Sequence, residues 1–171
     1  MTATEFNRAI DQWIEDVQQV SFIRICAKPS STSWSLGQVG VHLLDATNYF
    51  FEQATRCLST DEQATGEMKW NAKVMFQNNE FPDEMIEGPA SNQETPQPES
   101  KEKLLDGLLQ LKAEINKVDK LISTSSSKGK TKHPGLNYFN AREWFQFAYM
   151  HFRHHERQKR RIETYLKETS W

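Results

Sequence analysis

Residues 144–158 decide the fold, and they read Trp144-Phe-Gln-Phe-Ala-Tyr-Met-His151-Phe-Arg-His154-His155-Glu-Arg-Gln158. Aromatic and apolar positions recur here every three or four residues, which is the period of an amphipathic α-helix. His151 and His155 are four residues apart, so a helix projects both imidazoles from one face. The same face carries a row of apolar positions, namely Trp144, Ala148, Ile162 and Leu166. Both rings are therefore predicted to point into the core, where a neutral imidazole needs a hydrogen-bond partner or a metal ion.

His154 offers a competing pair with His151, because the two residues are three apart on the same helix. The row through this pair continues to Gln158, Arg161 and Tyr165, so its C-terminal end is more polar. We therefore predict that His155, and not His154, accompanies His151 at an inward site.

A third inward histidine, His42, is predicted on a separate helix. It shares an apolar row with Val39, Ala46 and Tyr49. Two histidines on one helix are often satisfied core residues, but three inward histidines out of five in the chain are hard to explain as packing. Three imidazoles would supply three nitrogen ligands and leave positions open, which is typical of catalytic metal sites. The chain has no second inward carboxylate pair, so a di-iron carboxylate site is not expected.

Helical periodicity predicts three further helices, at about 4–20, 35–58 and 101–123, before a last helix at about 140–167. The segment 59–99 is rich in proline, glycine, Asn and Gln, which forbids a long regular element. Because it also has apolar residues to bury, we interpret it as a packed crossover. No convincing strand is present. The prediction is an all-α fold: one domain over residues 1–171, built as a four-helix bundle with a long crossover between helices 2 and 3.

Capping residues mark where three of these helices begin. Ser35 is followed three residues later by Gln38, and Asn140 by Glu143, so both pairs fit the capping-box pattern. Ser100 stands directly before the third helix and is predicted to cap it.

The overall charge of the chain argues against nucleic acid as a partner. The formal net charge is -2 and the basic residues are dispersed. The one basic run comprises Arg157, Lys159, Arg160 and Arg161. It lies on a predicted helix with Glu156 and Glu163 beside it, so we interpret it as a solvated helix face. No apolar stretch is long enough to cross a bilayer and the N-terminus lacks a signal-peptide pattern, so a cytoplasmic protein is expected. Two cysteines, Cys26 and Cys57, are too few for a disulfide framework.

Three stretches together resemble the DinB-like superfamily of metal-binding four-helix bundles. The first is Trp34-Ser-Leu-Gly-Gln38-Val-Gly-Val-His42-Leu-Leu. The second is the tail His133-Pro134-Gly135, Glu143-Trp144 and His151-x-x-His154-His155-x-x-Gln158. The third is the crossover with Phe81-Pro82 and Pro96-x-Pro98. The last-helix pattern is most similar to a bacterial subgroup of that superfamily.

This resemblance implies a divalent metal ion on His42, His151 and His155. Many members are dimers, and apolar residues in the crossover also favour a homodimer here. Some relatives are S-transferases or isomerases that use a low-molecular-weight thiol, bacillithiol or mycothiol, and many others have no assigned activity.

The expected function is that of a metal-dependent enzyme acting on a small-molecule substrate. A divalent ion on three neutral imidazoles keeps its full charge and can activate a water or a thiol, as a hydrolase or a thiol S-transferase requires. Gln38 and Gln158 are candidates to bind the cofactor or orient ligands. Zinc or nickel is the expected ion. The alternatives are a non-enzymatic module that binds a metal or small ligand, and a structural bundle with satisfied core histidines.

Overall fold

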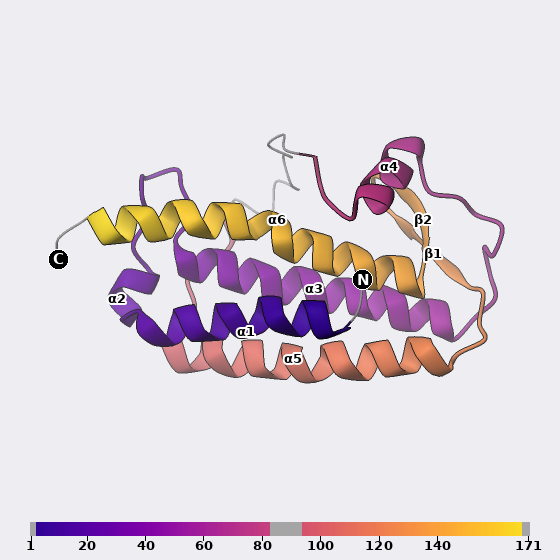
Figure 1. The fold of residues 1–171 in the computed structure, drawn as a ribbon, viewed down its shortest axis with the longest axis horizontal. Coiled ribbons are helices and arrows are strands. Elements are labelled where there is room, and N and C mark those ends of the chain that lie inside the picture. The colour runs from indigo at the N-terminus through magenta and orange to yellow at the C-terminus, as the bar shows by residue number, and fades with distance from the viewer. Residues whose placement is uncertain (1–2, 83–93, 169–171) are drawn as a thin grey trace.

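The computed structural model describes residues 3–82 and 94–168, which are mostly helical, as predicted. Figure 1 shows the long helices lying side by side; they are α1 (Ala3–Gln19), α3 (Leu36–Leu58), α5 (Lys101–Thr124) and α6 (Ala141–Glu168). The shorter elements are α2 (Phe22–Ile25), α4 (Trp70–Asn78), β1 (Lys130–His133) and β2 (Asn137–Asn140). Among the described residues, no helix combines the length and the apolar character needed to span a membrane.

A long connection joins α3 to α5 and lets these two helices run in the same direction. In Figure 1, α3 and α5 run from left to right, whereas α1 and α6 run from right to left. The connection occupies residues 59–100 and contains α4, which is only nine residues long. The sequence predicted no long regular element here, and α4 agrees with that. Residues 83–93, which include Met85, Ile86 and Pro89 of the predicted crossover, lie outside the described residues.

The predicted capping residues begin their helices as expected. The Ser35 hydroxyl accepts a hydrogen bond from the Gln38 backbone N–H, and the Gln38 side chain accepts one from the Ser35 N–H. At α6, the Glu143 N–H donates to Asn140 Oδ1 and the Asn140 N–H donates to the Glu143 carboxylate. The Ser100 hydroxyl accepts from the third residue of α5, Lys103. Each cap satisfies backbone donors that a helix terminus leaves unpaired.

The prediction that the chain has no strand was wrong for residues 130–140. These residues form an antiparallel hairpin in which Lys132 pairs with Tyr138. The hairpin lacks an alternating apolar pattern, and contacts with distant residues hold it instead. The Trp144 indole N–H donates to Thr131 Oγ1 at 2.7 Å, and the Lys130 backbone N–H donates to the Glu62 carbonyl at 3.0 Å. Such contacts leave no local signal in the sequence.

Gly129 allows the hairpin to approach the end of α3. A Cβ at this position would lie 2.2 Å from the Thr60 carbonyl oxygen, which is closer than atoms can approach. Next to it, the Ser127 hydroxyl donates to the Cys57 carbonyl at 2.7 Å. The hairpin is therefore tied to the C-terminal end of α3.

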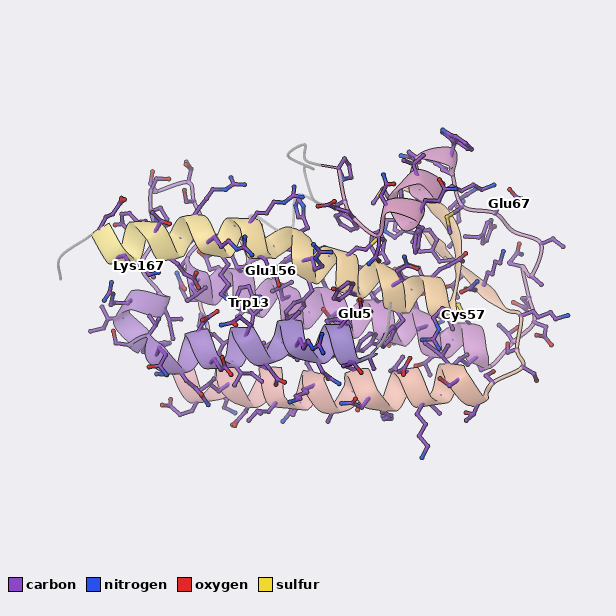
Figure 2. The ribbon with its side chains drawn as sticks, viewed as in Figure 1. Glu5, Trp13, Cys57, Glu67, Glu156 and Lys167 are labelled. Atoms are coloured by element: carbon purple, nitrogen blue, oxygen red, sulfur yellow. The ribbon has the colours of Figure 1, made fainter. Side chains whose placement is uncertain are left out.

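One member of the basic run in α6 is buried, so the prediction of a wholly solvated face was wrong for Lys159. Its side chain is only 7% exposed and pairs with Asp16 of α1 and with Glu163. Its ammonium also lies 5.1 Å from the ring centre of Trp13, which is labelled in Figure 2. The ion pair explains the burial, because a lysine enters a protein interior only with a partner for its charge.

Replacing Lys159 with Met is expected to lower the free energy of unfolding by about 2 kcal/mol, because the Asp16 carboxylate then loses its partner. The loss is smaller than for a fully buried pair, since the Asp16 side chain is 27% exposed. Chemical denaturation measures it. The control is Arg160→Met at the exposed neighbouring position, which should change stability by less than about 0.5 kcal/mol. Equal effects of the two substitutions would contradict a role for the ion pair.

Candidate metal centre

Three imidazoles converge between α3 and α6. His42 Nε2 lies 3.2 Å from His151 Nε2, and His155 Nε2 lies 3.2 Å from the same atom. The donor atoms of all three residues lie within 4.8 Å of one another. The predicted spacing of His151 and His155 on one helix face brings their rings together, and His42 meets them from the opposite helix.

These separations match those of nitrogens that share one metal ion. A zinc–imidazole bond is about 2.0–2.1 Å, so two nitrogens at a tetrahedral angle lie about 3.3 Å apart. His42, His151 and His155 therefore lie close enough to hold a metal ion.

The hydrogen bonds of the cluster are incomplete without a further group. His155 Nδ1 donates to Gln158 Oε1 at 2.9 Å, which leaves His155 Nε2 without a proton and with its lone pair directed at the cluster. His151 Nε2 carries at most one proton, so at most one of its two close contacts is a full hydrogen bond. The other ring nitrogen, His151 Nδ1, is buried and has no hydrogen-bond partner among residues 3–82 and 94–168. A cation at the centre would satisfy all three Nε2 lone pairs, so the donor set fits a metal ion.

All three imidazoles are neutral near pH 7, which is the form that binds metals. Burial lowers the pKa of His42. Burial is also the largest cause that lowers the pKa of His151 far below its usual range. Repulsion from His155 and His42 lowers the pKa of His151 further. Burial and the charge of His42 lower the pKa of His155 to about 3.

Aromatic side chains wall the cluster. The Trp34 ring lies 5.0 Å from the His42 ring, between centroids, and stacks against His155 at 6.3 Å. Phe50 and Phe81 contact the His151 ring edge-to-face at 5.4 and 6.1 Å. An apolar enclosure of this kind excludes water and strengthens the electrostatic effect of any charge inside it.

All three histidines are partly exposed. Among residues 3–82 and 94–168, no further His, Cys, Asp or Glu side chain joins them. An ion on three nitrogens would therefore keep coordination positions for water or a small molecule.

His154 lies beside the cluster and not within it. Its ring contacts Phe81 and His155, with centroid distances of 5.5 and 5.3 Å. The cluster thus contains the histidine pair that the more apolar helix row predicted.

The two glutamines that the sequence singled out have different roles. Gln158 orients the His155 ring through the hydrogen bond described above. Gln38 uses its amide in the capping box and donates through Nε2 to the Thr95 carbonyl at 2.6 Å, which ties the start of α3 to the crossover. That either residue binds a cofactor stays a prediction.

No family model, curated protein or solved structure matches this chain.

His133 is the last residue of β1, and its side chain holds the turn that follows. Its Nδ1 accepts hydrogen bonds from the backbone N–H groups of Gly135 and Leu136, at 3.1 and 3.2 Å. Burial lowers the pKa of His133 to about 4, and a proton on Nδ1 would also break both hydrogen bonds.

The pH dependence of the stability of a His133→Asn variant tests whether His133 stabilises the turn in its neutral form. The folded pKa lies below the ordinary value of 6.5, so the unfolded chain binds the extra proton between these values. The stability that neutral His133 contributes is present above pH 6.5 and is lost as the pH falls toward 4. Because Asn keeps a side-chain acceptor but does not titrate, the unfolding free energy of the wild type minus that of the variant should fall by roughly 2 kcal/mol between pH 7 and pH 4. Urea titrations of both metal-free proteins measure it, and a constant difference would contradict the assignment.

Proposed function

We propose that this chain is a metal-dependent enzyme that holds one divalent ion on His42, His151 and His155. The observation that carries the proposal is the convergence of three Nε2 atoms, two pairs of them 3.2 Å apart, in an incompletely satisfied cluster. A divalent ion bound there would supply Lewis-acid chemistry that lowers the pKa of a neighbouring water or thiol. The proposed reaction classes are hydrolysis and S-transfer from a low-molecular-weight thiol to a small-molecule substrate.

The chain's own residues would bind and orient the reacting groups. The three imidazoles are neutral donors, and Gln158 holds His155 in the tautomer that presents Nε2. Trp34, Phe50 and Phe81 would shield the site from water and provide apolar contacts for a substrate. The partial exposure of the histidines leaves a route for entry.

The resemblance to the DinB-like superfamily supports the same proposal. The parallel course of α3 and α5 across a long connection is compatible with a four-helix bundle of that type. We also propose, on the sequence alone, one domain over residues 1–171, a homodimer, a cytoplasmic location and zinc or nickel as the ion.

The second candidate is a non-enzymatic module that binds a metal or a small ligand. The aromatic enclosure of the cluster favours it, because such walls also suit a binding site without turnover. Assays with hydrolytic and thiol-transfer substrates distinguish the two. Turnover that His151→Ala abolishes supports the enzyme, whereas stoichiometric metal without turnover supports the module.

Elemental analysis of untagged protein tests the metal centre directly. Wild type reconstituted with zinc or nickel should hold about one ion per chain, and His151→Ala should hold none while keeping its helical circular dichroism. His154→Ala is the matched control and should keep the ion, because His154 lies outside the cluster. Metal in the His151 variant, or its loss in the His154 variant, would contradict the assigned ligands.

Gln158→Ala is expected to weaken zinc binding by about 10–100-fold, because the His155 ring loses the acceptor that fixes its tautomer. Competition with a chromophoric chelator measures the affinity. Gln110→Ala, at an exposed position on α5, makes the same substitution away from the cluster and should bind zinc like the wild type. An unchanged affinity in the Gln158 variant would show that the hydrogen bond does not orient the ligand.

A further inference from the structure

A hollow of about 470 Å³ lies where the C-terminal half of α3 meets the β1–β2 hairpin. Cys57 and Glu67, both labelled in Figure 2, mark this end of the molecule. The side chains that matter come from two elements: Tyr49, Gln53 and Arg56 from α3, and Lys130, Lys132 and Tyr138 from the hairpin. None of the three clustered histidines lines this hollow.

Three cations line the hollow and no carboxylate does. Lys130 and Lys132 are two residues apart on β1, so their side chains leave the same face of the hairpin. Lys130 donates to the Gly66 carbonyl at 2.6 Å, and its charge also acts on the nearby Glu67 carboxylate, which pairs with Lys73. Within the described part of the chain, the side chains of Arg56 and Lys132 form no ion pair or hydrogen bond. A chain with a net charge of -2 therefore presents a local concentration of positive charge.

Gln53, a largely buried residue, lines the same hollow. Gln53 is 7% exposed, and its side chain makes no hydrogen bond to any residue that the structure describes. Since Gln53 lines the hollow, its amide is available to donate to a ligand there.

Two tyrosines complete the wall. Tyr138 is the cross-strand partner of Lys132, so the two side chains are neighbours on one face of the hairpin. Tyr49 is 41% exposed and packs edge-on against Trp144, with ring centroids 6.1 Å apart. These residues offer aromatic surface and hydroxyl groups beside the cations.

We propose that this hollow binds a small organic phosphate monoester. Its dianionic phosphate lies between Arg56 and Lys132, with the Gln53 amide as a further donor, and its apolar part lies against Tyr49 and Tyr138. Two cations with free donors suit a group with two charges and several acceptor oxygens better than a singly charged carboxylate. The volume is in the range of small-molecule sites.

The hollow is a second site and does not depend on the proposed metal. His42, Tyr49 and Arg56 are seven residues apart in turn, so they follow one face of α3. At 1.5 Å per residue, Tyr49 lies about 10 Å and Arg56 about 21 Å along the helix from His42. A phosphate held by Arg56 is therefore too far from the histidines to be bound by an ion there.

Titration of phenyl phosphate into the full-length, chelator-treated protein tests the proposal, followed by backbone amide shifts in NMR spectra. Saturable shifts are expected at residues 49–56 and 130–138. Lys132→Gln and Arg56→Gln should each weaken binding about tenfold. The matched control is Lys128→Gln, which removes the same charge from an exposed position outside the hollow and should change the affinity less than about twofold.

Two further measurements distinguish a phosphate site in the hollow from anion binding at the histidine cluster and from binding of any anion. His151→Ala should bind phenyl phosphate like the wild type, and loss of binding there would place the anion at the histidine cluster and overturn the proposal. Benzoate should bind more weakly than phenyl phosphate, and equal affinity would overturn the phosphate class. Absence of saturable shifts up to about 10 mM, or equal losses in the Lys128 and Lys132 variants, would also overturn it. The titration uses metal-free protein, so a failure to bind phenyl phosphate would not count against the proposed metal centre. A failure to bind metal would likewise not count against the phosphate site.

Discussion

The packing of α3 against α6 is the contact on which the rest of the structure depends. Phe51 stacks on Phe145 with ring centroids 5.5 Å apart, and Phe50 meets Phe147 edge-to-face at 5.1 Å. The Phe50 ring also contacts His151, so the packing that joins the helices sets the position of the cluster. Close-packed rings fit together in only a few arrangements, so one helix cannot slide continuously along the other. A shift of one helical turn, about 5.4 Å, would separate nitrogens that now lie 3.2 Å apart.

Much of the fold and the histidine cluster could be predicted because their signals are local. The i, i+4 spacing of His151 and His155 lies within one helix, and the capping residues lie within three positions of each other. The prediction for His42 required only that its apolar row on the helix face the core. The tautomer of His155 and the exact approach of the nitrogens could not be predicted, since they depend on how two helices meet. The hairpin was missed for the same reason: its residues are polar, and the Trp144 indole and the Glu62 carbonyl that hold it come from elsewhere in the chain.

Buried polar groups divide this molecule into two kinds of region. Lys159 is buried with two carboxylates beside it, and Ser35 and Gln38 satisfy each other at the start of α3. These groups stabilise the fold, and nothing further is needed to explain them. At the histidine cluster and at the hollow, by contrast, the described residues leave groups available to a ligand, namely the clustered Nε2 atoms and the Gln53 amide.

The histidine cluster and the hollow both lie along one face of α3, and this arrangement has a physical basis. A helix clamped by aromatic packing on α6 holds His42 and Arg56 at a fixed separation of about 21 Å without relying on loop conformation. The chemistry of the two ends differs. The histidine end is apolar and walled by rings, so it keeps imidazoles neutral, whereas three cations line the hollow at the hairpin end. Desolvation keeps the imidazoles uncharged at the histidine end, and the hairpin lysines concentrate positive charge at the hairpin end. A neutral nitrogen donor set and an anion-binding surface can therefore coexist on a single helix without their electrostatics interfering, since the gap between them exceeds the screening length of about 8 Å at physiological salt.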